Sequence, residues 1–167
     1  MAPAGIDFCG SAFVYDVGVK SVVLAAKRSQ QHALTRWMSR AIVQRLTEGQ
    51  ADVRTYDALT WPPTTPDRVR ARGFDHGELL ARNVAVMLGI PAKRLLSRRS
   101  ASSSRRNAQG RTGVSFVPIV PWTSAVPSRV LLIDDVRTTG STLGAAAQAL
   151  RQAGTARVGA FTFAVKE

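Results

Sequence analysis

Cysteine is almost absent from this chain, since Cys9 is its one cysteine among 167 residues. A single thiol cannot close an internal disulfide or build a cysteine-rich zinc site. Long hydrophobic runs are also missing, because no stretch approaches the roughly 18 apolar residues that a membrane span needs. The N-terminal residues do not combine a basic start, an apolar core and a cleavage site. These absences predict a cytoplasmic protein with no membrane span.

Acidic residues are scarce as well, with 11 Asp and Glu against 23 Lys and Arg, for a net charge of +12. The stretch 62–111 holds eleven basic and three acidic side chains, so it supplies +8 of that charge. Such a basic field attracts polyanions, either nucleic acid or a heavily phosphorylated small molecule. The alternative is a solvated basic surface. Aromatic side chains are not interleaved with these arginines, which weakens the case for single-strand recognition by base stacking.

Apolar residues make up 45% of the chain, which is enough for a core and typical of one globular domain. Helical spacing of apolar residues predicts helices over 18–26, 34–47, 76–88 and 143–153. Runs typical of strands cover 53–61, 94–96, 115–120, 130–133 and 158–165. The strand, helix and strand over 130–165 form a βαβ unit. The sequence therefore predicts an α/β fold, with a mainly parallel sheet flanked by helices.

Three segments have no predicted helix or strand of their own. Residues 1–14 are predicted to be an irregular lead-in, with a short strand or the remnant of something longer as the alternatives. A proline-rich loop is predicted to run from Pro62 to Gly73. Residues 97–113 have no apolar period, and such a long segment is usually a functional lid or disordered.

The most informative stretch is VLLIDDVRTTGSTL, Val130 to Leu143. Four apolar residues predict a buried parallel strand, and Asp134 and Asp135 are predicted to follow it. Ligands bind beyond the carboxyl ends of strands in such sheets. Candidate phosphate-binding residues then form the loop before the next helix, whose free N–H groups favour an anion. These loop residues are Thr138, Thr139, Gly140, Ser141 and Thr142.

Two carboxylates beside a phosphate site must address another part of the ligand, because carboxylates repel phosphate. Ionised Asp134 and Asp135 can accept hydrogen bonds from ribose hydroxyls or lie near a Mg²⁺ ion, so a ribose 5-phosphate satisfies both ends. The simpler alternative is that Thr138 or Ser141 only caps the helix and that Asp134 pairs with a surface arginine. A Walker A loop is excluded, because no lysine follows Gly140.

These residues resemble the phosphoribosyl pyrophosphate (PRPP) signature of type I phosphoribosyltransferases, although Arg137 stands where an aliphatic residue is more common. A second stretch, RVRARGFDHGELLARNVAVMLGIP from Arg68 to Pro91, resembles the R-x-R-x-RGFNQ-x-ELLA region of the ComF competence-protein family. Asp75-His76 replaces the usual Asn-Gln. The resemblance covers residues 15–167 and implies the type I phosphoribosyltransferase fold. The N-terminal four-cysteine zinc module that many members carry is missing here.

The resemblance also implies roles for the basic residues. Arg68, Arg70 and Arg72 would lie in the loop that receives pyrophosphate, where a guanidinium fork suits phosphate oxygens. Residues 97–113 would be the flexible loop that closes over PRPP. Its arginines, Arg105, Arg106 and Arg111, could neutralise the leaving pyrophosphate. His32 and His76 are each predicted to be isolated surface residues.

Several function classes stay open at this point. The first is a phosphoribosyltransferase that uses Mg²⁺, held directly or indirectly by Asp134 and Asp135, and that transfers phosphoribose to an unidentified acceptor while it releases pyrophosphate. The second is a non-catalytic, PRPP-responsive protein that supports DNA uptake in competence. The third is a binder of single-stranded DNA. A homodimer is a candidate assembly, because a neighbouring copy often assists closure of the flexible loop in this fold.

Overall fold

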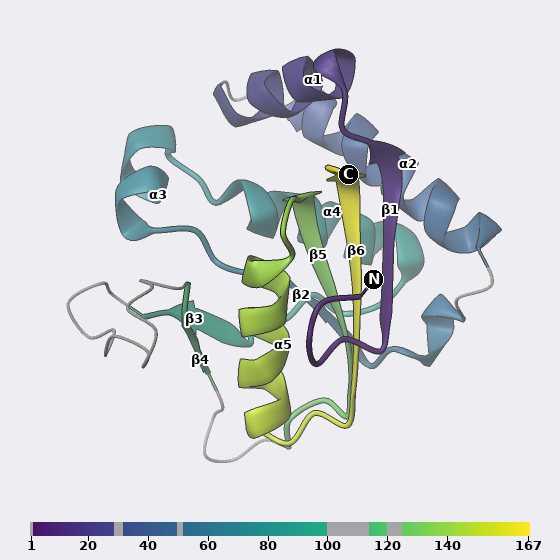
Figure 1. The fold of residues 1–167 in the computed structure, drawn as a ribbon, viewed down its shortest axis with the longest axis vertical. Coiled ribbons are helices and arrows are strands. Elements are labelled where there is room, and N and C mark those ends of the chain that lie inside the picture. The colour runs from purple at the N-terminus through teal and green to yellow at the C-terminus, as the bar shows by residue number, and fades with distance from the viewer. Residues whose placement is uncertain (1, 29–31, 50–51, 100–113, 120–124) are drawn as a thin grey trace.

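A parallel sheet organises the computed structural model, which describes residues 2–28, 32–49, 52–99, 114–119 and 125–167 (Figure 1). In chain order the elements are β1 (Phe8–Val14), α1 (Val17–Arg28), α2 (His32–Glu48), the 3-10 helix η1 (Val53–Thr55), β2 (Ala58–Thr60), α3 (Pro66–Arg72), α4 (His76–Leu88), β3 (Leu96–Arg98), β4 (Phe116–Pro118), β5 (Arg129–Arg137), α5 (Ser141–Gln152) and β6 (Arg157–Val165). Within the described residues, four strands pair in the order β1-β6-β5-β2, and all neighbours are parallel.

The βαβ unit predicted over 130–165 is confirmed, because β5 and β6 are parallel neighbours joined through α5. Val130 to Ile133 are completely buried, as expected for a central strand of a parallel sheet. Gly159 on β6 allows Tyr56 to pack closely, because a Cβ there would lie 2.1 Å from the Tyr56 hydroxyl oxygen. The parallel pairing holds β5 and β6 side by side, with the acidic pair towards the carboxyl end of β5.

Helices cover both faces of the sheet (Figure 1). One core cluster joins apolar residues of α2 and α4 to one face, with Met38, Ile42 and Leu80 fully buried in it. A second cluster joins α5 to the other face and includes Leu96 of β3 and Phe116 of β4, which pair in a short antiparallel ribbon. The predicted α/β class, a parallel sheet flanked by helices, is confirmed. No helix in the described part of the chain has the length and apolar character needed to cross a membrane.

The prediction of a loop from Pro62 to Gly73 is wrong, because residues 66–72 form α3. The Thr65 hydroxyl oxygen accepts a hydrogen bond from the Arg68 N–H at the start of the helix. Pro66 occupies the first turn, where its missing N–H costs nothing, and Gly73 ends the helix with a φ of 81°. The prolines that indicated a loop thus mark a helix start.

The irregular lead-in predicted for residues 1–14 is wrong in its second half, where the alternative of a short strand is confirmed. Residues 8–14 form β1, a strand of the main sheet that pairs with β6 from Phe8 to Val14. The alternation of this strand is weak because it lies at the sheet edge, so its sequence carries little strand signal. The preceding segment turns back over α5, where Pro3 contacts the position of Gly140.

The remaining elements agree with the predictions apart from their ends. The four predicted helices correspond to α1, α2, α4 and α5, and Gly89 ends α4 in the left-handed conformation, as its position indicated. Of the predicted strand over 53–61, residues 58–60 form β2, and η1 takes the first part. The strand predicted over 94–96 lies at 96–98.

Candidate functional site

A polar cleft of about 380 Å³ lies where β2 and β5 reach their carboxyl ends. It contains five residues that the sequence selected: Arg68, Arg72, Asp134, Asp135 and Thr142. Further residues line it: Lys27, Pro62, Pro63, Thr64, Asp75, His76, Gly77, Arg98, Val114 and Val136. The fold thus brings the predicted acidic pair and two of the predicted arginines to one place.

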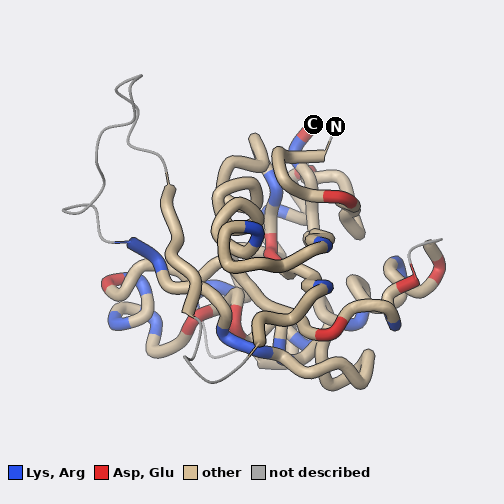
Figure 2. Tube along the Cα trace, turned by 90° about the horizontal axis from the view of Figure 1, so that it is seen from below, with Lys and Arg blue, Asp and Glu red and all other residues tan. Residues whose placement is uncertain are grey.

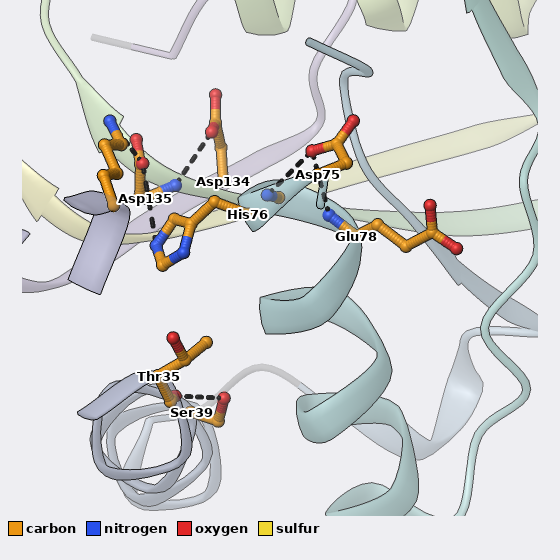
Figure 3. Close-up of polar contacts among 9 residues, drawn as sticks. Thr35, Ser39, Asp75, His76, Glu78, Asp134 and Asp135 are labelled. Atoms are coloured by element: carbon orange, nitrogen blue, oxygen red, sulfur yellow. Dashed lines mark hydrogen bonds and ion pairs between the residues drawn. The ribbon is translucent and has the colours of Figure 1, made fainter. Parts of the chain in front are cut away.

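The acidic pair lies within β5 rather than after it. The strand continues to Arg137 because β6 pairs with it as far as Val165, so the expected strand end at Ile133 is wrong. Asp134 turns a carboxylate oxygen back to accept a hydrogen bond from the Asp135 N–H at 2.8 Å (Figure 3). The two carboxylates are therefore held in fixed positions by the sheet.

Each carboxylate has a different electrostatic environment. The Asp135 Oδ2 atom lies 2.5 Å from the Lys27 Nζ atom, which reaches it from the last turn of α1. Desolvation in the cleft, and then the nearby charge of Asp135, raise the pKa of Asp134 to about 8. At neutral pH the free cleft therefore favours the protonated form of Asp134, beside the ion pair of Asp135 with Lys27.

His76 lies directly below this pair, at the start of α4 (Figure 3). Its Nε2 atom is 3.9 Å from Asp135 Oδ2, and neither ring nitrogen has a hydrogen-bond partner in the described structure. The predicted surface position of His76 is wrong, because the residue is only 2% exposed. Burial lowers its pKa, although Asp135 opposes this change, so the ring is neutral at neutral pH.

Asp75 connects α4 to the loop that follows β2. Its carboxylate accepts hydrogen bonds from the N–H groups of Gly77 and Glu78, which caps the helix. It also accepts one from the Thr64 N–H at 3.0 Å. The negative cap thus fixes the segment that forms one wall of the cleft.

The helical form of α3 decides which predicted arginines enter the cleft. Arg68 and Arg72 are four residues apart, so they share one helix face, and both line the cleft. Arg70 lies on another face and forms an ion pair with Asp67 at the surface. Arg98 of β3 joins the two cleft arginines, although the motifs assigned it no role. Burial, and then the charge of Arg68, lower the pKa of Arg98.

The predicted phosphate loop is placed at the start of α5, and Thr142 is its residue that lines the cleft. Gly140 has a φ of 76° and immediately precedes the helix. The Thr139 hydroxyl oxygen accepts a hydrogen bond from the Ser141 N–H, while Thr138, Thr139 and Ser141 are exposed. The loop has the backbone form of a helix N-terminus, where free N–H groups favour an anion.

Arg105, Arg106 and Arg111 lie outside the described residues, as does most of the segment 97–113. The sequence reasoning missed Lys27, His76 and Arg98. The signal for Arg98 was its place in the basic middle of the chain, but Lys27 had none, because its partner Asp135 is distant in the sequence.

The described donor atoms do not by themselves form a complete site for Mg²⁺. No three His, Cys, Asp or Glu side chains among the described residues are arranged to hold a metal. In addition, the ammonium group of Lys27 already balances Asp135.

Comparison with known proteins shows that the chain is similar in sequence to a competence protein. No protein-family model matches the chain. The competence protein ComFC of Streptococcus pneumoniae (strain ATCC BAA-255 / R6) is 33% identical over 101 residues, which is 60% of this chain and 44% of ComFC. The predicted resemblance to ComF proteins is confirmed by this match, which spans less than half of the relative.

Two solved structures are similar to the chain. A purine phosphoribosyltransferase from Pyrococcus horikoshii Ot3 is 19% identical, with a TM-score of 0.49 over 83% of this chain and 76% of that one. A hypothetical protein from Neisseria gonorrhoeae, with ppGpp bound, is 16% identical, with a TM-score of 0.50 over 81% of this chain and 69% of that one. The chain therefore shares its α/β fold with the Neisseria protein, and it resembles a competence protein in sequence.

Proposed function

We propose that the cleft binds PRPP and that the chain is a ComF-type protein with the type I phosphoribosyltransferase fold. One observation carries this proposal: a single cleft holds the Asp134–Asp135 pair, an arginine group and a residue of the phosphate loop. A sugar that carries a phosphate and a diphosphate suits all three parts of the cleft. Its hydroxyls can bind the carboxylates, and its anionic groups can bind the arginines and the phosphate loop.

The arginine group supports a diphosphate as part of the ligand. Arg68, Arg72 and Arg98 form no ion pair with any described residue, and Arg68 and Arg98 repel each other. The backbone offers few competing donors, because Pro62, Pro63 and Pro66 lack an N–H and that of Thr64 is bound to Asp75. Guanidinium groups would therefore make most of the diphosphate contacts.

The reaction in this proposal is a displacement at the anomeric carbon of PRPP. A nucleophile forms a bond to that carbon while the bond to the pyrophosphate oxygen breaks, and the electron pair leaves with pyrophosphate. Arg68, Arg72 and Arg98 would stabilise the charge on the leaving group. Asp134 and Asp135 would hold the ribose and oppose the positive charge that builds on its ring. Mg²⁺ belongs to the proposal as an ion bound to the diphosphate, where it would neutralise charge.

The binding proposal is tested by titrating PRPP with Mg²⁺ into the protein and measuring heat. We expect Asp134→Asn combined with Asp135→Asn to weaken binding at least 100-fold, because the ribose loses both carboxylates. Asp57→Asn, at the other end of the sheet beside Arg129, is the matched control and should change nothing. Unchanged affinity in the double variant would refute this placement of the site.

Turnover is a separate question, tested by pyrophosphate release in a screen of bases and amines. Release with any acceptor supports a transferase. PRPP binding without release would favour the alternative, a PRPP-responsive protein that acts in competence and DNA uptake, as the similarity to ComFC suggests. A cytoplasmic location and a homodimer are also part of the proposal, and light scattering on the purified protein tests the dimer.

Single-stranded DNA is a second candidate partner, favoured by the wide distribution of basic residues along the fold (Figure 2). Lys93, Arg94 and Arg99 are exposed on the same stretch of chain as Arg98, so a strand could follow them. Affinity for a short oligonucleotide should then fall steeply with added salt. No binding even at low salt would exclude this partner.

A further inference from the structure

Lys27 supplies a positive charge to the acidic pair from within the protein. Its ammonium group lies 2.5 Å from Asp135 Oδ2, and its side chain is only 27% exposed. It reaches the cleft from α1, whereas Asp135 lies on β5. The charge of Asp135, whose side chain is 12% exposed, is thus balanced by the protein itself.

The groups around this ammonium are those that divalent cations prefer. Asp134 and Asp135 supply carboxylate oxygens, and His76 supplies an imidazole whose two nitrogens have no partner in the described structure. The His76 ring is almost completely buried and lies 3.9 Å from Asp135. Two carboxylates and one imidazole form a ligand set for Mn²⁺ and related ions. In the described structure these three side chains are not arranged as a metal site.

We propose that Lys27 is the built-in counter-cation of this acidic pair and that it keeps divalent cations off Asp134, Asp135 and His76. A carboxylate such as that of Asp135 in a partly buried site needs a positive charge, and removing one partner of the ion pair leaves the other uncompensated. A tethered ammonium supplies this charge without recruiting an ion from solution. Its loss makes a divalent cation the simplest replacement. This inference concerns the free cleft, so it holds whether or not the protein transfers phosphoribose.

The test is a titration of the free protein with Mn²⁺ alone, in which electron paramagnetic resonance measures the unbound ion. We expect Lys27→Met to bind one Mn²⁺ ion at least tenfold more tightly than the unmodified protein. Lys27→Met combined with Asp135→Asn should lose this gain, because a charged ligand is gone. Lys27→Arg, which keeps the charge, should exclude Mn²⁺ as the unmodified protein does.

The matched control is Lys20→Met, which removes an exposed lysine from the same helix and should bind no additional Mn²⁺. Circular dichroism checks that each variant is folded, and Lys27→Gln, with a polar head group, replaces Lys27→Met if that variant unfolds. A folded Lys27 variant with no gain would overturn the proposal. An unmodified protein that binds Mn²⁺ as tightly as the Lys27 variant would also overturn it. PRPP titration on the same samples tests the proposed function separately.

Discussion

The acidic and basic halves of the cleft are built in opposite ways. In the acidic half, Asp135 already has Lys27 as its partner, and Asp134 is held by the Asp135 N–H. In the basic half, Arg68, Arg72 and Arg98 face the same space and have no acidic partner among the described residues. The protein itself balances the charge of the acidic half, whereas only a bound anion can balance the charge of the basic half.

This difference indicates how the free energy of the cleft is divided. Partners inside the fold contribute to stability, since breaking a buried ion pair leaves a desolvated charge. Arg68 and Arg72 have no such partner among the described residues, so their charge is available to an anion, whereas Arg98 also lies over the Phe116 ring. Substitutions in the acidic half should therefore affect folding and binding together, and those of Arg68 and Arg72 should affect binding alone.

The largest expected effect is on the basic half. Arg68→Ala combined with Arg72→Ala should weaken binding of pyrophosphate or PRPP at least 100-fold, because each charge-assisted hydrogen bond contributes about 1.5–3 kcal/mol. The melting temperature should not fall. Calorimetric titration and thermal unfolding of the same samples measure both quantities.

Arg70→Ala is the matched control for this pair, because Arg70 lies on the same short helix and pairs with Asp67 at the surface. Its effect on affinity should be less than twofold. A large loss of stability in the double variant would contradict the division between the two halves, since it would mean that these arginines have partners within the fold.

The second prediction concerns the phosphate loop and whether Gly140 fixes its backbone conformation. Gly140→Ala should lower the free energy of unfolding by about 2 kcal/mol, because left-handed backbone costs a Cβ-bearing residue roughly 1–2 kcal/mol and crowding adds to it. The φ of Gly140 is 76°, and a Cβ there would lie 2.6 Å from the Pro3 Cγ atom. Urea unfolding measures the change. Gly144→Ala is the control, because its Cβ would meet nothing closer than 3.7 Å, and equal stability of the two variants would show that the loop adapts.

Much of this arrangement could be predicted from the sequence, because the signals were local. The buried run Val130–Ile133 and the helical spacing after Gly140 predict the βαβ unit and place the acidic pair at its carboxyl end. The position of the arginines near that pair followed from resemblance to a known family. Which of Arg68, Arg70 and Arg72 face the cleft did not follow from the resemblance, because it depends on the helix α3. The prolines near this segment had indicated a loop instead.

The remaining errors have a different physical origin. Lys27 lies on a helix that carries no motif, and its role comes from a partner brought near by the fold. His76 was predicted to be exposed because no apolar pattern indicates burial of the first residue of a helix. Both residues contact the acidic pair through tertiary packing, which sequence spacing does not encode. The half of the cleft that the fold itself satisfies is therefore the harder one to predict.

The last expected effect is a dependence of stability on pH that comes from Asp134. The folded protein raises the pKa of Asp134 from its ordinary value of 3.8 to about 8, so it retains a proton that the unfolded chain releases. Stability from this group is complete below about pH 4 and is lost as the pH rises towards 8, by at most about 1.4 kcal/mol per pH unit.

Asp134→Asn has no proton to release, so urea unfolding between pH 5 and pH 8 should give it a flatter profile. Asp57→Asn should keep the original slope, because Arg129 lowers the pKa of Asp57 and its titration lies below this range. Identical slopes for the protein and Asp134→Asn would mean that Asp134 is ionised in the free cleft, and the acidic half would then carry two charges against the single ammonium of Lys27.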